Sequence, residues 1–321
     1  MIGVKNPSTI IGDNLCGEVW FNELRIAGID NKGGWASIGS IDGNMADFLN
    51  FSGNTRYSSI GFGSIDQSPN QRAREELFQY DFTTAGDVAK LLPASFGIQI
   101  PLNYSVGEVI ISPEFDPFYQ DIKLKDRMDA SDSNEQKNKI REQAIDYTKR
   151  KNISIVGVKK ISNLEKKKFY NIENFDFSYS FNEIYHHDYE IENQKNKNIR
   201  LQGNYGYNFQ SLEILPFYKL KFLKNKRYLE WLKNLNFNPI PSSMSFSANI
   251  NRTLNSQQFR DVYADSKTET SLLALPVLLQ RNFLFDNTYN LQYNLTRSAR
   301  INFTSTTSRI IRNYLKEENE D

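Results

Sequence analysis

Residues 175–191, FDFSYSFNEIYHHDYEI, decide the fold. Successive side chains of a β-strand point to opposite faces, so odd and even positions of this stretch separate. The odd positions carry mostly aromatic side chains, from Phe175 to Tyr189, and the even positions carry mostly hydroxyl, amide and carboxylate groups. The stretch therefore predicts a strand with one aromatic face and one polar face.

The same alternation recurs along the chain. It returns at residues 199–209, 243–254 and 283–296 and continues at 301–304. The polar residues 193–198 separate the alternating stretch 175–191 from the stretch 199–209, so they predict the turn of a hairpin. Clusters of Gly, Asn, Asp and Pro bound further strand candidates at 19–26, 35–41, 48–57, 77–88, 96–104 and 153–158.

The length of the predicted strand separates two all-β architectures. Residues 175–191 would extend over roughly 56 Å at about 3.3 Å per residue, far beyond the usual strand of a globular protein. Strands of membrane barrels are long and alternate between a lipid-facing and a lumen-facing side. The pattern favours an antiparallel transmembrane β-barrel. The alternative is a soluble or surface β-sandwich that buries its aromatic stripes between two sheets and acts as a protein-binding module.

Composition removes other classes of protein. The longest apolar run, residues 272–279, is far shorter than the roughly 18 residues that a membrane-spanning helix needs, and Pro276 interrupts it. With 39 basic against 38 acidic residues, the chain carries no electrostatic signature of a nucleic-acid partner. Its single cysteine, Cys16, excludes an internal disulfide.

The domain organisation follows from the strand candidates. Residues 1–30 are expected to form an N-terminal strand segment, the tail of a preceding β region. Residues 31–321 are expected to form barrel strands with inserted loops near 107–150, 211–242 and 256–281.

The first insertion is expected to contain one or two short helices. Within residues 112–150, Ser133 and Gln136 have the spacing of a capping box, and Ile140, Ala144 and Tyr147 repeat at helical intervals. A further short helix is expected at 228–235, before two prolines.

No catalytic, cofactor-binding or metal-binding residues emerge from the sequence, and we expect no enzyme. His186 and His187 are adjacent, so in a strand they point to opposite faces and cannot chelate one metal together. The acidic residues of the first insertion lack the spacing of a calcium loop. The segment 61–63 lacks the third glycine and the following helix of a phosphate-binding loop.

Several segments, taken in order, resemble the SprA/Sov proteins. They are CGEVWFNELR at 16–25, DNKGGWA at 30–36, GFGSI at 61–65, DYTKRK at 146–151, FYNIENF at 169–175, YSFNE at 179–183 and NLTRS at 294–298. The residues that carry the strongest part of the resemblance are Glu18, Trp20, Asn22, Glu23, Arg25, Asp30, Gly33, Gly34 and Trp35.

The resemblance implies a translocon of the type IX secretion system, linked to gliding motility, in the outer membrane at the cell surface of a Gram-negative bacterium. Such a channel passes folded cargo proteins and needs no cofactor. The implied partners are secreted cargo, plug and lipoprotein-type subunits of the secretion system and outer-membrane lipid, with no nucleic acid. The resemblance also implies a very large barrel. Family members are several times longer, so we expect this chain to be an excerpt or fragment, an antiparallel transmembrane β-barrel segment that forms an incomplete wall of such a barrel.

The alternation of odd and even positions then assigns residues to the two faces of that barrel. The residues expected to face the lumen are Asp176, Ser178, Ser180, Asn182, Gln202 and Asn204. The residues expected to face lipid are Phe175, Phe177, Tyr179, Phe181, Tyr205 and Tyr207.

Overall fold

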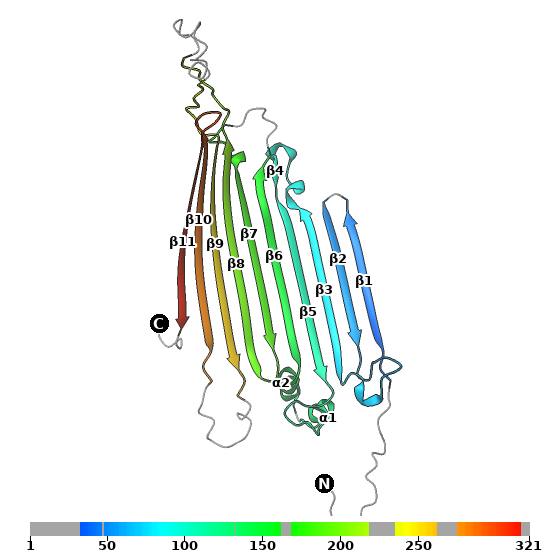
Figure 1. Cartoon of the computed structure of the whole chain (residues 1–321). Helices are drawn as coiled ribbons and strands as arrows, with labels where there is room; N and C mark the ends of the chain where they lie inside the picture. Colours follow the sequence, from blue (N-terminus) through cyan, green and yellow to red (C-terminus); the bar gives the residue numbers. More distant parts are fainter. Residues whose placement is uncertain are drawn as a thin grey trace, which may run out of the picture.

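The computed structural model describes residues 33–46, 48–131, 133–161, 168–217, 235–261 and 275–315. These residues form one sheet of 11 strands with a few short helices attached (Figure 1). The prediction of an all-β, antiparallel protein is therefore confirmed. The residues expected to form a strand at 19–26, and nearly all of the helix expected at 228–235, lie outside the described ranges.

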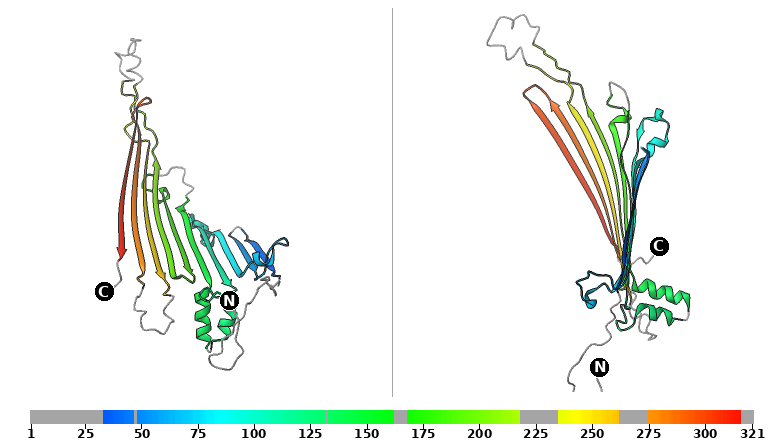
Figure 2. Two further views of the ribbon diagram at one scale, coloured as in Figure 1. Left: turned by 60° about the horizontal axis from the view of Figure 1, so that its bottom comes forward. Right: turned by 90° about the vertical axis from the view of Figure 1, so that its right-hand side faces the viewer.

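The long strands follow one another as an up-and-down meander. They are β1 (Ala36–Met45), β2 (Leu49–Ser58), β3 (Glu75–Asp87), β5 (Pro101–Pro113), β6 (Asp146–Lys160), β7 (Phe175–His187), β8 (Ile191–Asn208), β9 (Ser243–Phe259), β10 (Leu278–Asn294) and β11 (Arg300–Leu315). Each pairs antiparallel with the next in this order, and the two-residue strand β4 (Ile98–Gln99) pairs with β6. The sheet is twisted and open, with β1 and β11 at its two edges, so it is not a closed barrel (Figure 2).

Two α-helices mark one end of the sheet. α1 (Leu124–Asp129) and α2 (Asn134–Ala144) connect β5 to β6 and project from the edge that lies at the bottom of Figure 1, which we call the helix end. The N-cap Ser133 accepts a hydrogen bond from the N–H of Glu135 (3.2 Å), as expected for a serine before a helix. The expected insertion was too long, since β5 continues to Pro113 and β6 starts at Asp146. Tyr147 consequently belongs to a strand.

Short 3₁₀ helices occupy other connections. They are η1 (Pro69–Gln71), η2 (Val88–Leu91), η3 (Ala94–Phe96) and η4 (Ile172–Asn174). The strand candidate at 96–104 is divided among η3, β4 and the start of β5, because Gly97 adopts a left-handed conformation (φ 57°) that interrupts the extended chain.

The predicted turn at 193–198 was wrong. β7 ends at His187 and β8 begins at Ile191, so residues 193–198 belong to β8. The turn forms at residues 188–190 because Asp188 can close it: its Oδ1 accepts hydrogen bonds from the N–H groups of Glu190 (2.8 Å) and Ile191 (2.6 Å). The third expected insertion is likewise shorter, since β9 continues to Phe259 and β10 starts at Leu278.

Very little of the described chain is buried. The buried hydrophobic residues are Ala89, Leu124, Ala144, Ile145 and Tyr205. Three of these lie in or beside α1 and α2 rather than in the middle of the sheet. Among the described residues, no helix has the length and apolarity to span a membrane. The sheet is thus a single layer whose two faces decide what the protein can contact.

Candidate functional surface

Strand register joins the aromatic stripes of single strands into one continuous face. Residues that lie directly opposite in an antiparallel pair share a face. Tyr179 lies opposite Ile155 and Leu201, and Leu201 in turn lies opposite Ile250. The predicted lipid-facing residues Phe175, Phe177, Tyr179, Phe181, Tyr205 and Tyr207 all lie on this side, which we call the aromatic face.

The aromatic face has no protein layer over it among the described residues. Phe175 and Phe177 are 51% and 49% exposed although they lie on an interior strand. Near the end opposite the helices, Phe175 packs on Tyr205 (ring centroids 4.9 Å apart). Contiguous exposed apolar surface of this extent marks an interaction surface.

The other side, which we call the polar face, is a ladder of amides, hydroxyls and carboxylates. Asn204 Nδ2 donates to Asp176 Oδ1 (2.7 Å), and Gln202 Nε2 donates to Asn204 Oδ1 (3.2 Å). Ser178 Oγ accepts a hydrogen bond from the N–H of Gly157 (2.9 Å), where a bulge interrupts the pairing of β6 with β7. The predicted lumen-facing residues Asp176, Ser178, Ser180, Asn182, Gln202 and Asn204 all lie on this face.

Charged residues on the aromatic face gather toward the helix end. Three ion pairs lie there: Lys149 with Glu108 (2.6 Å), and Glu183 with Lys195 (3.3 Å) and Lys197 (3.5 Å). The members of this cluster, which we call the basic belt, are Glu108, Lys149, Lys151, Glu183, Lys195, Lys197, Arg252 and Arg281. Six cations against two carboxylates leave the belt positive. The sequence reading missed it, because parity within one strand does not show which charges come together across strands.

The upper limit of these charges rises across the strands in unequal steps: it stays in one row from β6 to β8 and drops by one row from β9 to β10. On each long strand from β3 to β11, the limit is the last charged residue that the aromatic face carries between the helix end and the apolar stretch. In strand order these residues are Glu76, Glu108, Lys151, Glu183, Lys197, Arg252, Arg281 and Arg309. From Glu76 on β3 to Arg309 on β11, this limit climbs about five rows of opposite residues, or about ten positions, over seven steps between strands.

A strand tilt explains such a climb. If strands 4.8 Å apart tilt by about 40° to a flat boundary, the boundary moves by about 4 Å along each successive strand, a little over one residue. The observed climb agrees with that value. The limit therefore has, on average, the slope of a plane that cuts tilted strands at one depth.

The height of the apolar band is set on β6. Lys151 lies at one limit and Lys160 at the other, with Ile153, Ile155 and Val158 between them. The bulge after Ile155 shifts the alternation by one residue, so Val158 and Lys160 share the aromatic face with Ile155. Because the bulge adds one residue to β6, this interval lies opposite eight positions of β7, which correspond to about 26 Å along a strand and about 20 Å after a tilt of about 40°. An apolar band of a membrane barrel is about 25 Å tall.

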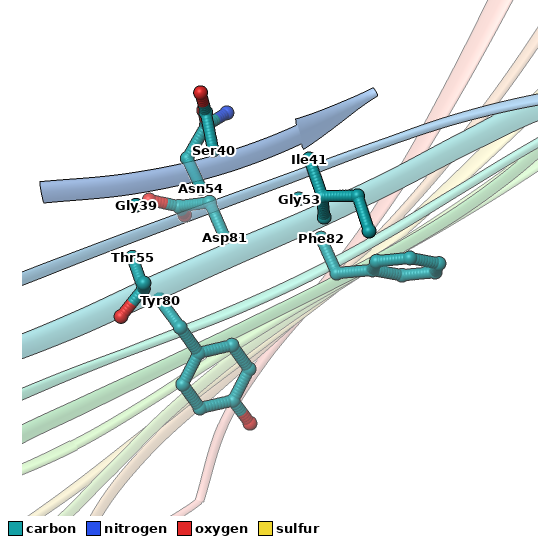
Figure 3. Close-up of a pocket in the computed structure, with 9 residues that line it drawn as sticks. All are labelled: Gly39, Ser40, Ile41, Gly53, Asn54, Thr55, Tyr80, Asp81 and Phe82. Atoms are coloured by element: carbon teal, nitrogen blue, oxygen red, sulfur yellow. The ribbon is translucent and has the colours of Figure 1, made fainter. Parts of the chain in front are cut away.

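A shallow groove of about 390 Å³ lies where β1–β3 carry glycines instead of side chains (Figure 3). Gly39 and Gly53 form its floor, and Ile41, Tyr80 and Phe82 border it. It lies within the part of the aromatic face above Glu76 and has the apolar character of its surroundings.

The two histidines point to opposite faces, as predicted. His186 lies on the polar face, with Nδ1 3.0 Å from Thr148 Oγ1 and Nε2 3.3 Å from Asp188 Oδ2. His187 packs against Tyr147 on the aromatic face (5.2 Å between centroids). Burial of Asp188 opposes its ionisation, but the hydrogen bonds from the N–H groups of Ile191 and Glu190 outweigh it and lower the pKa of this carboxyl.

Part of the sequence motif forms a close contact at the helix end of β1. Gly34 lies so near the backbone of residues 60–62 that a Cβ atom there would come within 2.2 Å of Phe62 N. The Trp35 ring packs on Tyr57 (4.7 Å between centroids), and the backbone N–H of Trp35 donates a hydrogen bond to Ser59 Oγ (2.9 Å). The described residues of the first of these segments, 33–36, therefore lie beside the start of the segment 61–65. The described part of the motif is Gly33, Gly34 and Trp35; Glu18, Trp20, Asn22, Glu23, Arg25 and Asp30 lie outside the described residues.

Within the described ranges, no three His, Cys, Asp or Glu side chains are arranged to hold a metal ion. The surface that remains defines a class: all-β proteins built on one long-stranded antiparallel sheet with an aromatic and a polar face. Residues 1–128 match the SprA N-terminal family model, described as motility related/secretion protein. This match covers the first 128 of the 321 residues, supports the resemblance to the SprA family and points to a role related to motility or secretion. No curated protein matches the chain.

Proposed function

We propose that this chain is part of the wall of a large outer-membrane β-barrel through which folded cargo proteins are secreted. The observation that carries the proposal is the uncovered aromatic face, which extends over the long strands of the sheet. Lipid is the environment in which such a face is stable without a second protein layer. The match to a motility and secretion family supports the same reading.

Two measures of the aromatic face support a bilayer as its environment. The diagonal limit of the charged residues has the average slope expected where tilted barrel strands leave the apolar region. The interval between Lys151 and Lys160, about 20 Å high after tilt, is close to the height of the apolar band of a membrane barrel, about 25 Å. A sandwich interface would require neither this average slope nor this height.

In this proposal the polar face lines the water-filled lumen. Its β8 and β9 stretches carry mostly neutral amide and hydroxyl groups, such as Gln202, Asn204, Ser247 and Asn249. Such groups exchange hydrogen bonds with water and offer a passing protein neither an apolar patch nor a strong field of one sign. Folded cargo would slide past them without sticking.

The working channel requires more strands than the described sheet has. In lipid, the unpaired backbone groups along the edge strands β1 and β11 would each cost several kcal/mol. Closure by additional strands at both edges removes that cost. Plug and lipoprotein-type subunits remain the proposed partners at the mouths.

Photo-crosslinking from adjacent residues of β8 tests this function. A photoreactive amino acid replaces Gln202 on the polar face or, as a matched control, Leu201 on the aromatic face. In secreting cells, we expect adducts with an epitope-tagged passenger protein from position 202 and none from position 201. Passenger adducts from 201, or equal yields from both positions, would contradict a lumen on the polar side.

A further inference from the structure

The basic belt lies at one limit of the apolar band and carries an excess of positive charge. We infer that it is a binding surface for the phosphate headgroups of the adjoining lipid leaflet. This inference rests on the proposed function, because it needs the aromatic face to lie in a bilayer. It adds the chemistry of the lipid that the wall recognises and the level at which it does so.

The position of the belt favours headgroups over lipid tails. Lys151 and Lys197 both lie opposite Glu183, four residues from Tyr179 in the centre of the apolar stripe. Four residues extend about 13 Å along a strand and about 10 Å in depth after tilt. The belt thus lies close to the edge of a band about 25 Å tall, where long basic side chains extend toward water and phosphate.

The belt's cations exceed what its own carboxylates can pair. Glu108 pairs with Lys149, and Glu183 is shared between Lys195 and Lys197. Arg252 and Arg281 are exposed on β9 and β10, where the belt includes no carboxylate. Anionic phosphate supplies the complementary charge, and arginine matches its geometry with two parallel hydrogen bonds.

Charges on the polar face are arranged differently. They occur along the height of the strands and in both signs, with Arg150 near the helix end, Arg200 in the middle of β8 and Asp176 near the far end of β7. A surface for one class of anion would gather cations at one level, as the belt does. The polar face therefore provides cations of equal charge for a matched control.

The test compares lipid preference in reconstituted protein. The wall is purified from native membranes together with the strands that close both edges, either as wild type or with Lys151→Gln, Arg252→Gln and Arg281→Gln, and is reconstituted into bilayers of phosphatidylcholine and phosphatidylglycerol in equal parts. The measurement is the relative association constant of labelled phosphatidylglycerol over labelled phosphatidylcholine. We expect the wild type to prefer phosphatidylglycerol and the variant to lose roughly a hundredfold of that preference, because each basic side chain near an anionic surface contributes about 1 kcal/mol.

The control variant carries Arg150→Gln, Arg200→Gln and Arg312→Gln on the polar face, with the same change in net charge. It should keep the preference of the wild type. The inference is overturned if both variants lose the preference equally, or if the wild type inserts but binds the two lipids equally. Neither result would contradict the proposed function as a barrel wall. If the closed wild-type assembly enters bilayers of neither lipid, the proposed function itself is overturned.

Discussion

Replacing Tyr179 with arginine should destabilise the membrane-inserted protein by roughly 2 to 4 kcal/mol, the cost of a basic side chain on the lipid face near the bilayer midplane. Tyr179 lies in a row of apolar residues, directly opposite Ile155 and Leu201 and in line with Leu102 and Ile250. The nearest charge on its own strand and face is Glu183, too far away along β7 to pair with the new side chain. Denaturant unfolding from lipid vesicles measures the loss.

The matched control is Asn182→Arg on the polar face of the same strand. Its cross-strand neighbours Asn152 and Asn198 are neutral, whereas Ser180 lies opposite Arg200 and would add repulsion between like charges. We expect a cost below about 1 kcal/mol at this position, as for a surface substitution. Similar costs for the two variants would show that lipid does not lie on the aromatic side.

The second large effect is expected at Asp116, beside α1. Its side chain is fully buried, accepts hydrogen bonds from the N–H groups of Phe118 (2.8 Å) and Tyr119 (3.2 Å), and pairs with Arg127. Asp116→Ala removes the acceptor of two backbone donors and leaves the guanidinium unpaired. Removing one partner of a buried pair costs roughly 3 to 5 kcal/mol. The lower end applies here, because the Arg127 side chain is 20% exposed.

Hydrogen exchange of residues 114–145 measures that loss locally. Protection of this connection should fall in Asp116→Ala, while β7 and β8 keep theirs. Asp121→Ala, an exposed acidic residue in the same connection, serves as the control and should exchange like the wild type. If both variants retain protection, the buried carboxylate does not organise the helices.

Alternation within strands could be predicted because it is a local property of the sequence. The odd-numbered residues from Phe175 to Phe181, with Tyr205 and Tyr207, lie on one face as expected. Alternation of side chains between the two faces depends only on the strand itself. The start of β8 could not be predicted in this way. Residues 193–198 read as a polar turn because their side chains are polar on both faces, yet Asp188 offers a better turn and frees them to pair.

Features that depend on several strands at once were beyond the sequence reading. The basic belt exists only after register aligns Lys151, Glu183 and Lys197 across β6, β7 and β8. Asp116 looked like one of many solvated acidic residues, and its burial depends on Arg127 from the following helix. The close approach of Gly34 to the backbone of 60–62 likewise requires the β1–β2 pairing.

The central claim is that the aromatic face meets lipid and the polar face meets water. Cysteine scanning of residues 176–182 in native membranes tests it most directly, in a background where the single native cysteine is replaced by Cys16→Ser. A water-soluble maleimide should label positions 176, 178, 180 and 182 and leave 177, 179 and 181 unlabelled until detergent is added. Uniform labelling, or labelling of the aromatic positions first, would contradict the account.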